Sequence, residues 1–483
     1  MGRRRIILLL ADGSRPDVLG ALLADGALPA IAAAFPEPAM RREATTVFPS
    51  TTGPAFLPFL TGCYPGRLNM PGIRWFDRAA WAERNGAPSY RSYVGLESFR
   101  MNADLAAGRP TLFEILPRSV NIFSSVNRGV PRRGNLTALS RAAWWGYAHE
   151  TSRWDRVSER ARRHLLAALD LDPEFVFCLV PDIDNMSHLS HCRSDIAIAA
   201  YRRFDRTVGD LFAELDRRRW RDDTLVMVVS DHGHMAVQAH LGLPEWVGRQ
   251  GMRPFYYPRI WRREFDSAVM VSGNGMAHVH VRRGREWSAE PAWDDYLRQH
   301  CGALLDALVA RPEIGLVATR RADGTVVIRS RAGMAFLRRT ADGRLDYRAE
   351  GGDPLGYDGL DGVWHPDDVL AATWRTRYPD GPVQLMQVFD SSRSGDIVVS
   401  AEPGYDLRDT HERPEHRSGH GALHEEHLRV PWLSTAPLPD VPLRTVDAFP
   451  FVLRWVGKPI PSEIDGRDLA NLEGGLSAAS RAR

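Results

Sequence analysis

Three short apolar segments in the first half of the chain have the pattern of β-strands that are buried on both faces. They cover residues 6–11, 175–180 and 224–229, and apolar residues run through them without regular alternation. Such strands are typical of a parallel sheet that is covered by helices. Helical spacing of apolar residues follows the second run, at 195–217. The pattern predicts an α/β core with a mostly parallel central sheet and helices on both faces.

The pattern changes between residues 242 and 395, where short alternating segments are separated by turns. Alternation of apolar and polar residues is typical of antiparallel strands. We expect an inserted α+β cap, so that the chain divides into core residues 1–241, the cap at 242–395, the C-terminal part of the core at 396–475 and a tail at 476–483. A strand that starts near Asp396 and a closing segment at 446–469 are expected to complete the central sheet. Residues 85–155 show no comparable pattern.

The composition is that of a globular protein. A chain of 483 residues with 44% hydrophobic residues can bury a full core. Its 62 basic and 60 acidic residues nearly balance, and no long basic run indicates a nucleic-acid surface. Four scattered cysteines favour a reducing compartment. The apolar run at the N-terminus is shorter than a signal-peptide core, and no stretch is long enough to span a membrane, so we expect a cytoplasmic protein.

Aspartates follow all three predicted strands. Asp12 comes directly after the first strand, Asp184 lies four residues beyond the second, and Asp231 follows the third after one serine. The carboxyl ends of parallel strands meet at one edge of a sheet, where α/β proteins bind their ligands. We therefore expect these carboxylates to lie close together.

Histidines extend this set of candidate metal ligands. His188 lies four residues after Asp184, so on a helix the two share one face. His232 is adjacent to Asp231, and His420 stands between two glycines that leave its backbone room to approach a site. With the hydroxyl of Thr52 the donors are Asp12, Thr52, Asp184, His188, Asp231, His232 and His420. Oxygen and nitrogen donors without sulfur suit a pair of zinc or manganese ions better than a structural zinc site.

Thr52 lies in the segment TVFPSTTGPAFLPFLTGCYP, residues 46–65. An apolar run after Pro54 predicts a buried helix that ends at Thr61-Gly62, which places Thr52 at or just before the helix N-terminus. Unpaired N–H groups and the helix dipole favour anions there, so a phosphate could be held against the Thr52 hydroxyl. The alternative is that Thr52 and its neighbours are ordinary N-cap residues.

Each of the other candidates also has a purely structural explanation. Asp12 can cap the helix that follows it, Asp184 and His188 can form a surface pair, and His232 can be a core histidine. His420 lies near four further histidines, His411, His416, His424 and His427, which is also the pattern of a flexible histidine-rich loop. The joint pattern favours a metal site, because the carboxylates recur at strand ends.

In order and spacing, these motifs resemble the alkaline phosphatase superfamily, and within it the type I phosphodiesterase and nucleotide pyrophosphatase branch, with phosphonoacetate hydrolase as a near relative. The resemblance is carried by Asp12-Gly13, Thr52-Gly53-Pro54, Thr61-Gly62, Asp184 with His188, Ser230-Asp231-His232-Gly233 and His420-Gly421. It spans the core as far as the C-terminal IDGRDL and matches the cap loosely. An alkaline phosphatase-like fold is implied.

The resemblance also implies roles for these residues. The first metal ion would be held by Asp184, His188 and His420, and the second by Asp12, Asp231, His232 and the Thr52 oxygen. The family's threonine nucleophile matches Thr51 or Thr52, and the spacing to Thr61-Gly62 favours Thr52. The implied cofactors are two divalent ions, zinc or alternatively manganese.

One departure from the family concerns the binding of the phosphoryl oxygens. Family phosphodiesterases usually place an asparagine downstream of the nucleophile, where this chain reads Asn69-Met70-Pro71-Gly72-Ile73-Arg74, and Asn69 or Arg74 is the candidate for its role. The aromatic residues near the start of the cap are expected either to form one wall of the pocket or to pack within the cap. They are Tyr256, Tyr257, Trp261, Trp287 and Trp293.

The implied activity is hydrolysis of a small-molecule phosphate or phosphonate ester. A threonine hydroxyl is a poor nucleophile near neutral pH, and coordination to a divalent ion makes its alkoxide available. We therefore expect a phosphodiesterase or nucleotide pyrophosphatase that forms a phosphothreonine at Thr52. A sulfatase would need C-x-P-x-R at the nucleophile, whereas this chain has PSTTGP. A phosphomonoesterase, a phosphonate hydrolase and a catalytically silent metal-dependent binding protein remain alternatives.

Overall fold

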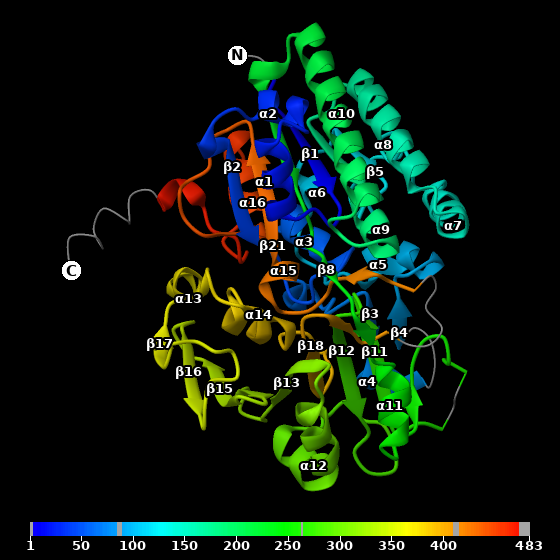
Figure 1. The fold of residues 1–483 in the computed structure, drawn as a ribbon, viewed down its shortest axis with the longest axis vertical. Helices are drawn as coiled ribbons and strands as arrows, with labels where there is room; N and C mark the ends of the chain where they lie inside the picture. The colour runs from blue at the N-terminus through cyan, green and yellow to red at the C-terminus, as the bar shows by residue number, and fades with distance from the viewer. Residues whose placement is uncertain (1–2, 85–88, 262–263, 409–414, 473–483) are drawn as a thin grey trace, which may run out of the picture.

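Two β-sheets organise the protein, one in each half of the molecule (Figure 1). The computed structural model describes residues 3–84, 89–261, 264–408 and 415–472. The expected tail at 476–483 and His411 lie outside the described residues. Within the described part of the chain, no helix has the length and apolar character needed to cross a membrane.

The first sheet has seven strands and is mostly parallel, as predicted. Strands β7, β1, β6 and β5 pair in parallel, and β21 is antiparallel to both of its neighbours. The three apolar segments of the sequence form β1, β6 and β7, with β1 between the other two. In sheet order the strands are β22 (Leu443–Arg444), β2 (Arg41–Thr45), β21 (Arg429–Ser434), β7 (Thr224–Val229), β1 (Arg5–Ala11), β6 (Phe175–Val180) and β5 (Ser119–Ile122).

Helices flank this sheet, which explains why its central strands are apolar throughout. On one side α8 packs against β6, and α10 packs against α8, α9 and α2. Alternate side chains of β6 point to the opposite face, where Phe175 contacts Phe113 and Phe177 contacts Phe56, with ring centroids 5.3 and 5.9 Å apart. The flanking helices include α1 (Pro16–Ala24), α2 (Pro29–Ala34), α3 (Leu57–Thr61), α6 (Leu112–Ile115), α7 (Arg141–Thr151), α8 (Trp154–Ala168), α9 (Asp182–Leu189) and α10 (Asp195–Arg218).

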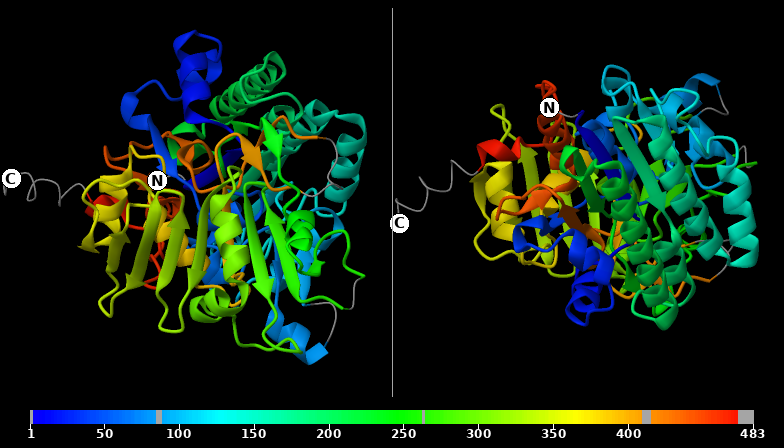
Figure 2. Two further views of the ribbon diagram at one scale, coloured as in Figure 1. Left: turned by 60° about the horizontal axis from the view of Figure 1, so that its bottom comes forward. Right: turned by 90° about the horizontal axis from the view of Figure 1, so that it is seen from above.

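The second sheet has nine strands, and all of its pairs except β10–β11 are antiparallel. Its strands lie side by side with α12 (Asp294–Ala310) against one face (Figure 2). In sheet order they are β10 (Pro254–Phe255), β11 (Ser267–Ser272), β12 (Met276–Val281), β18 (Ile397–Ala401), β13 (Ile314–Arg320), β14 (Val326–Ser330), β15 (Gly333–Arg339), β16 (Leu345–Glu350) and β17 (Gly362–Trp364). The helices α11 (Leu243–Arg249), α13 (Pro366–Thr373) and α14 (Gly381–Val388) belong to the same half of the chain.

The strand after Asp396 joins this second sheet and not the first, contrary to expectation. It is β18, which pairs with β12 and β13. Val398 packs into one apolar cluster and Ile397 and Val399 into another, so the strand is buried on both faces. A doubly buried strand is apolar in either kind of sheet, and its sequence therefore does not show which sheet it joins. The domain boundaries expected from the sequence remain a prediction. The boundary between residues 395 and 396 would separate β18 from β12 and β13, the strands with which it pairs.

The closing segment at 446–469 does not supply a strand, which corrects a second expectation. The last strand of the first sheet is β22, and it is followed by α16 (Ala448–Trp455). Phe449, Val452 and Leu453 of α16 are buried at helical spacing. Their burial against the core stabilises a helix where the apolar composition alone suggested a strand.

Candidate active site

The carboxyl ends of three parallel strands meet at one edge of the first sheet, as the sequence predicted. Asp12 directly follows β1, and Asp231 lies two residues beyond β7. Helix α9 begins two residues after β6 and carries Asp184 in its first turn. Gly13 allows the close approach of the first loop to the helix, because a Cβ atom at this residue would lie 2.9 Å from the Cα atom of Asp184.

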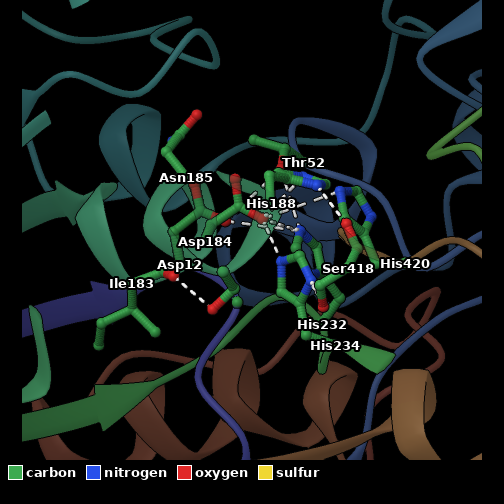
Figure 3. A network of polar contacts seen from close by, with 12 residues as sticks. Asp12, Thr52, Ile183, Asp184, Asn185, His188, His232, His234, Ser418 and His420 are labelled. Atoms are coloured by element: carbon green, nitrogen blue, oxygen red, sulfur yellow. Dashed lines mark hydrogen bonds and ion pairs between the residues drawn. The ribbon is translucent and has the colours of Figure 1, made fainter. Parts of the chain in front are cut away.

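Four imidazoles surround the carboxylate of Asp184 (Figure 3). The Nε2 atoms of His188, His420 and His232 lie 3.3, 3.8 and 3.9 Å from its Oδ1 atom. The Nε2 atom of His234 lies 2.6 Å from the same oxygen. Asp184 and the histidines are buried or nearly so, which excludes the surface pair that the spacing of Asp184 and His188 also allowed.

A short two-stranded sheet brings the chain segments of these histidines together. Strand β8 (Met235–Ala236) follows the loop after β7, and it pairs with β20 (Ser418–Gly419), which ends just before His420. The rings of His232 and His420 consequently stack, with centroids 3.6 Å apart and planes inclined by 8°. His420 is therefore part of a packed site and does not lie in a flexible loop.

Backbone carbonyl groups orient three of these rings. The Nδ1 atoms of His188, His232 and His420 lie 2.7, 3.1 and 2.8 Å from the carbonyl oxygens of Ser418, Gly233 and Ser50. A carbonyl oxygen only accepts, so each Nδ1 carries the proton and each Nε2 presents a lone pair. Histidine ligands of metal ions are held in this way in proteins.

A second group of donors adjoins the first through His232. Its Nε2 atom is 3.4 Å from Oδ1 of Asp12 and 3.4 Å from Oδ2 of Asp231. The hydroxyl oxygen of Thr52 lies 3.0 Å from the same Nε2 atom and 3.5 Å from Oδ1 of Asp12. Donor atoms of Asp12, Asp231 and His232 form one group, and those of Asp184, His232, His234 and His420 form another, with all atoms of a group within 4.8 Å of one another.

The electrostatics of these groups fit bound cations. Burial, together with the neighbouring Asp184 carboxylate, raises the pKa of Asp231 to about 7, and burial and the adjacent carboxylates raise the pKa of Asp12 well above its usual value. The buried Oδ2 atom of Asp231 has no hydrogen-bond partner among the described residues. Burial lowers the pKa of His232 to about 3, so its imidazole is neutral. Crowded carboxylates beside neutral imidazoles are a donor set that a divalent ion stabilises.

Thr52 is the threonine that reaches the donors. It precedes a short helical turn at Pro54–Phe56 and α3, which ends at Thr61 as the sequence predicted; Gly62 then adopts the left-handed conformation. The N–H groups of Thr52 and Gly53 donate no hydrogen bond within the described part of the chain. The hydroxyl of the neighbouring Thr51 is buried without a hydrogen-bond partner among the described residues. The geometry thus separates the two threonines that the spacing left as candidates.

His234 is a site residue that the sequence analysis missed. Its Nε2 atom is within hydrogen-bond distance of Asp184, and its Nδ1 atom lies 3.0 Å from the Ser418 hydroxyl. A proton must lie between Nε2 and the carboxylate at 2.6 Å, so the imidazole donates to Asp184 and fixes its orientation. The only available signal was a second histidine two residues after His232 in the sequence SDHGH.

A cavity of about 740 Å³ opens onto these groups. Asp12, Thr52, Asp184, His188 and His420 line one end, which we call the metal-ligand end. Leu96, Phe123, Arg141, Trp145 and His149 also line the cavity, and we call their part of it the α7 end. The site therefore has room for a substrate that extends well beyond one phosphoryl group.

The two candidate phosphoryl-binding residues have different surroundings. Arg74 lines the cavity, donates from Nε to the Ser92 hydroxyl at 3.2 Å, and lies near the ring of Tyr257. Asn69 is not among the lining residues, and its side-chain oxygen accepts hydrogen bonds from Ser391 and Ser392 at 2.7 and 3.1 Å. The structure therefore brings Arg74 to the site but not Asn69.

Most of the five aromatic residues of the expected cap do not line the cavity. Tyr257 lines the cavity. Trp287 contacts Phe76 and Phe265 with ring centroids 4.9 and 5.2 Å apart, and the Trp261 side chain is 69% exposed. Only one of the five aromatic residues thus forms part of the cavity wall among the described residues.

Solved structures share this arrangement of elements. The phosphonoacetate hydrolase from Sinorhizobium meliloti 1021, solved in complex with phosphonoformate, superimposes with a TM-score of 0.56 at 16% identity, over 94% of this chain and 96% of that one. Murine ectonucleotide pyrophosphatase/phosphodiesterase 5 superimposes with a TM-score of 0.58 at 12% identity, over 98% and 99% of the two chains. The chain therefore has the same overall fold as these two proteins, with a large, mostly parallel sheet flanked by helices.

The family follows from the sequence match. Residues 6–423 match the type I phosphodiesterase / nucleotide pyrophosphatase family, and the chain belongs to it. No protein with a curated description matches the chain. The resemblance and the fold class inferred from the sequence are both confirmed.

Proposed function

We propose that the protein is a metal-dependent hydrolase of phosphate esters, and in the first place a phosphodiesterase or nucleotide pyrophosphatase. One observation carries this proposal: the Thr52 hydroxyl lies 3.0 Å from Nε2 of His232 and 3.5 Å from Oδ1 of Asp12, where the two donor groups meet. A hydroxyl nucleophile beside a set of metal ligands is the arrangement that phosphoryl transfer to a side chain requires. Membership of the family supports the same activity.

Two divalent ions, zinc in the first place, would be held by these donors. Asp184, His188 and His420 would hold one, and Asp12, Asp231, His232 and Thr52 the other. The unpartnered Oδ2 atom of Asp231 and the outward-facing lone pairs of the imidazoles fit this assignment. Ions bound there supply positive charge that favours the ionised Thr52 hydroxyl and offsets the charge of the phosphoryl group.

The reaction then proceeds in two displacements. The Thr52 oxygen attacks phosphorus in line with the leaving alcohol, the bond from phosphorus to that alcohol breaks, and a phosphothreonine forms. The N–H groups of Thr52 and Gly53 are free to donate to the phosphoryl oxygens, and Arg74 lines the same cavity. Water next attacks the phosphothreonine, which releases the phosphate product and restores the hydroxyl.

Hydrolysis of two chromogenic esters tests the proposal. Purified protein is assayed on bis-p-nitrophenyl phosphate and p-nitrophenyl phosphate, as isolated, after chelation, and after zinc or manganese is added back. We expect cleavage that favours the diester, disappears with chelator and returns with metal. A preference for the monoester would indicate a phosphomonoesterase. Stoichiometric metal without cleavage of either ester would contradict the proposal and favour a narrow phosphonate hydrolase or a binding protein.

A further inference from the structure

One face of α7 forms the wall of the cavity at the α7 end. Arg141, Trp145 and His149 line the cavity and follow one another at intervals of four residues, so they project from the same side of the helix. Trp145 contacts Phe123 and Trp154 with ring centroids 5.3 and 5.7 Å apart. This wall is therefore an aromatic surface with the Arg141 guanidinium at the start of the helix and the His149 imidazole in its last turn.

Arg141 has no carboxylate partner in the described part of the chain. Arg141 takes part in no ion pair within 4.0 Å among the described residues, and its side chain donates one hydrogen bond, to the Ser98 hydroxyl. Its guanidinium lies 5.7 and 5.8 Å from the ring centroids of Phe99 and Trp145. Burial lowers the pKa of Arg141 to about 10, which still leaves it charged at neutral pH.

Without a bound anion, the position of the Arg141 charge is unfavourable for the stability of the folded protein. A partly buried cation is normally paired, because it loses hydration without gaining a counter-charge. Arg141 is also the first residue of α7, where the helix dipole favours acidic side chains over basic ones. Arginine stems often cover apolar surface at the rim of a protein, but then the guanidinium lies in solvent. An anion that enters the cavity would relieve both costs.

We infer that Arg141 binds a second anionic group of the substrate, a carboxylate or a phosphate, while the scissile phosphoryl or phosphonyl group lies at Thr52. This inference rests on the proposed function and adds the substrate class: phosphate or phosphonate compounds with a second acidic group beyond an apolar linking segment. The planar guanidinium can donate two parallel hydrogen bonds to either anion. Phe123 and Trp145 line the cavity beside it and would contact the linking segment.

Matched pairs of non-hydrolysable ligands test the inference by binding alone. Alkylphosphonates with chains of two to eight carbons are compared by calorimetry with the corresponding ω-carboxyalkylphosphonates and α,ω-bisphosphonates, using zinc-loaded protein. For at least one chain length we expect the second anion to tighten binding by about tenfold or more. Comparison of the affinities of the carboxyalkylphosphonates and the bisphosphonates shows which second anion is preferred.

Variants test whether the tighter binding produced by the second anion depends on Arg141. The gain is expected to disappear in Arg141→Gln and to persist in part in Arg141→Lys. It should be unchanged in Arg163→Gln, which removes an exposed arginine of α8 that pairs with Glu159. Simple alkylphosphonates should bind all four proteins within about twofold of one another.

Three results would overturn the inference. A second anion that changes wild-type affinity by less than twofold at every chain length would show that no such subsite exists. A gain that survives in Arg141→Gln would assign it to another group, such as Arg74. If no phosphonate binds the zinc-loaded protein at all, the proposed function fails and the inference fails with it, whereas binding of simple alkylphosphonates alone rejects only the inference.

Discussion

The metal-ligand end and the α7 end of the cavity are built in different ways. At the metal-ligand end, short loops after β1 and β7 and the first turn of α9 hold the donors, and backbone carbonyl groups fix the rings of His188 and His420. At the α7 end, Arg141, Trp145 and His149 of one helix form a wall together with Leu96 and Phe123. The comparison suggests that chemistry resides at the first end and selection of the substrate at the second.

The largest effect on turnover is expected when Thr52, the proposed nucleophile at the metal-ligand end, is replaced. Thr52→Ala should lower turnover of the diester by about 10³-fold or more, because among the described residues no other hydroxyl lies at the meeting point of the donor groups. Metal content, measured by mass spectrometry, should remain. The control is Thr51→Ala, which removes a hydroxyl without a hydrogen-bond partner among the described residues and should stay within about tenfold of wild type. Full activity in Thr52→Ala would reject Thr52 as the nucleophile.

The next largest effect, on bound metal and activity, is expected for Asp184, whose carboxylate lies among the four imidazoles. Asp184→Asn should reduce bound metal after dialysis and lower activity by about 10²-fold, since a neutral amide is a weaker ligand than a carboxylate. Asp182→Asn is the matched control on the same helix, because Asp182 pairs with Arg203 outside the donor groups. Equal metal loss in both variants would show that the effect reflects misfolding rather than ligation.

A smaller effect is expected for His234, which holds Asp184. His234→Gln should weaken zinc affinity by about 10- to 100-fold in competition with a chromogenic chelator, while metal still binds at saturation. His240→Gln, which alters a histidine paired with Asp406, should leave the affinity unchanged. Metal loss as complete as in Asp184→Asn would instead make His234 a direct ligand.

The smallest effect tests whether the α7 end acts on substrate binding alone. Trp145→Ala should raise KM for an apolar diester by up to about tenfold and leave kcat within about twofold. Trp144→Ala is the control, because the adjacent side chain packs against the hydrophobic core and does not line the cavity. A fall in kcat larger than the change in KM would mean that the two ends do not have separate roles.

The sequence predicted the residues of the metal-ligand end better than those of the α7 end. The metal-ligand end was predicted because its residues directly follow buried strands or lie one helical turn apart, as Asp184 and His188 do. His234 was missed because its role depends on the pairing of β8 with β20, which joins segments about 180 residues apart. Local sequence patterns do not indicate such contacts.

The α7 end was not predicted because α7 has little amphipathic pattern. Trp144 and Trp145 are adjacent, so aromatic side chains leave the helix on two sides. Both pack against the core, and Trp145 also lines the cavity. The strand β18 shows the same limit for the fold, since its burial on both faces is compatible with either sheet. Asn69 and Arg74 were the two candidates for binding the phosphoryl oxygens; Arg74 lines the cavity, whereas the Asn69 side chain is hydrogen-bonded to Ser391 and Ser392 away from it.

The most direct test of the account is a crystal structure of the zinc-loaded protein with anomalous scattering data collected at the zinc edge. We expect two peaks at the metal-ligand end, one among Asp184, His188 and His420 and the other among Asp12, Asp231, His232 and the Thr52 oxygen. A single peak, or peaks away from Thr52, would contradict a two-metal site built around this hydroxyl.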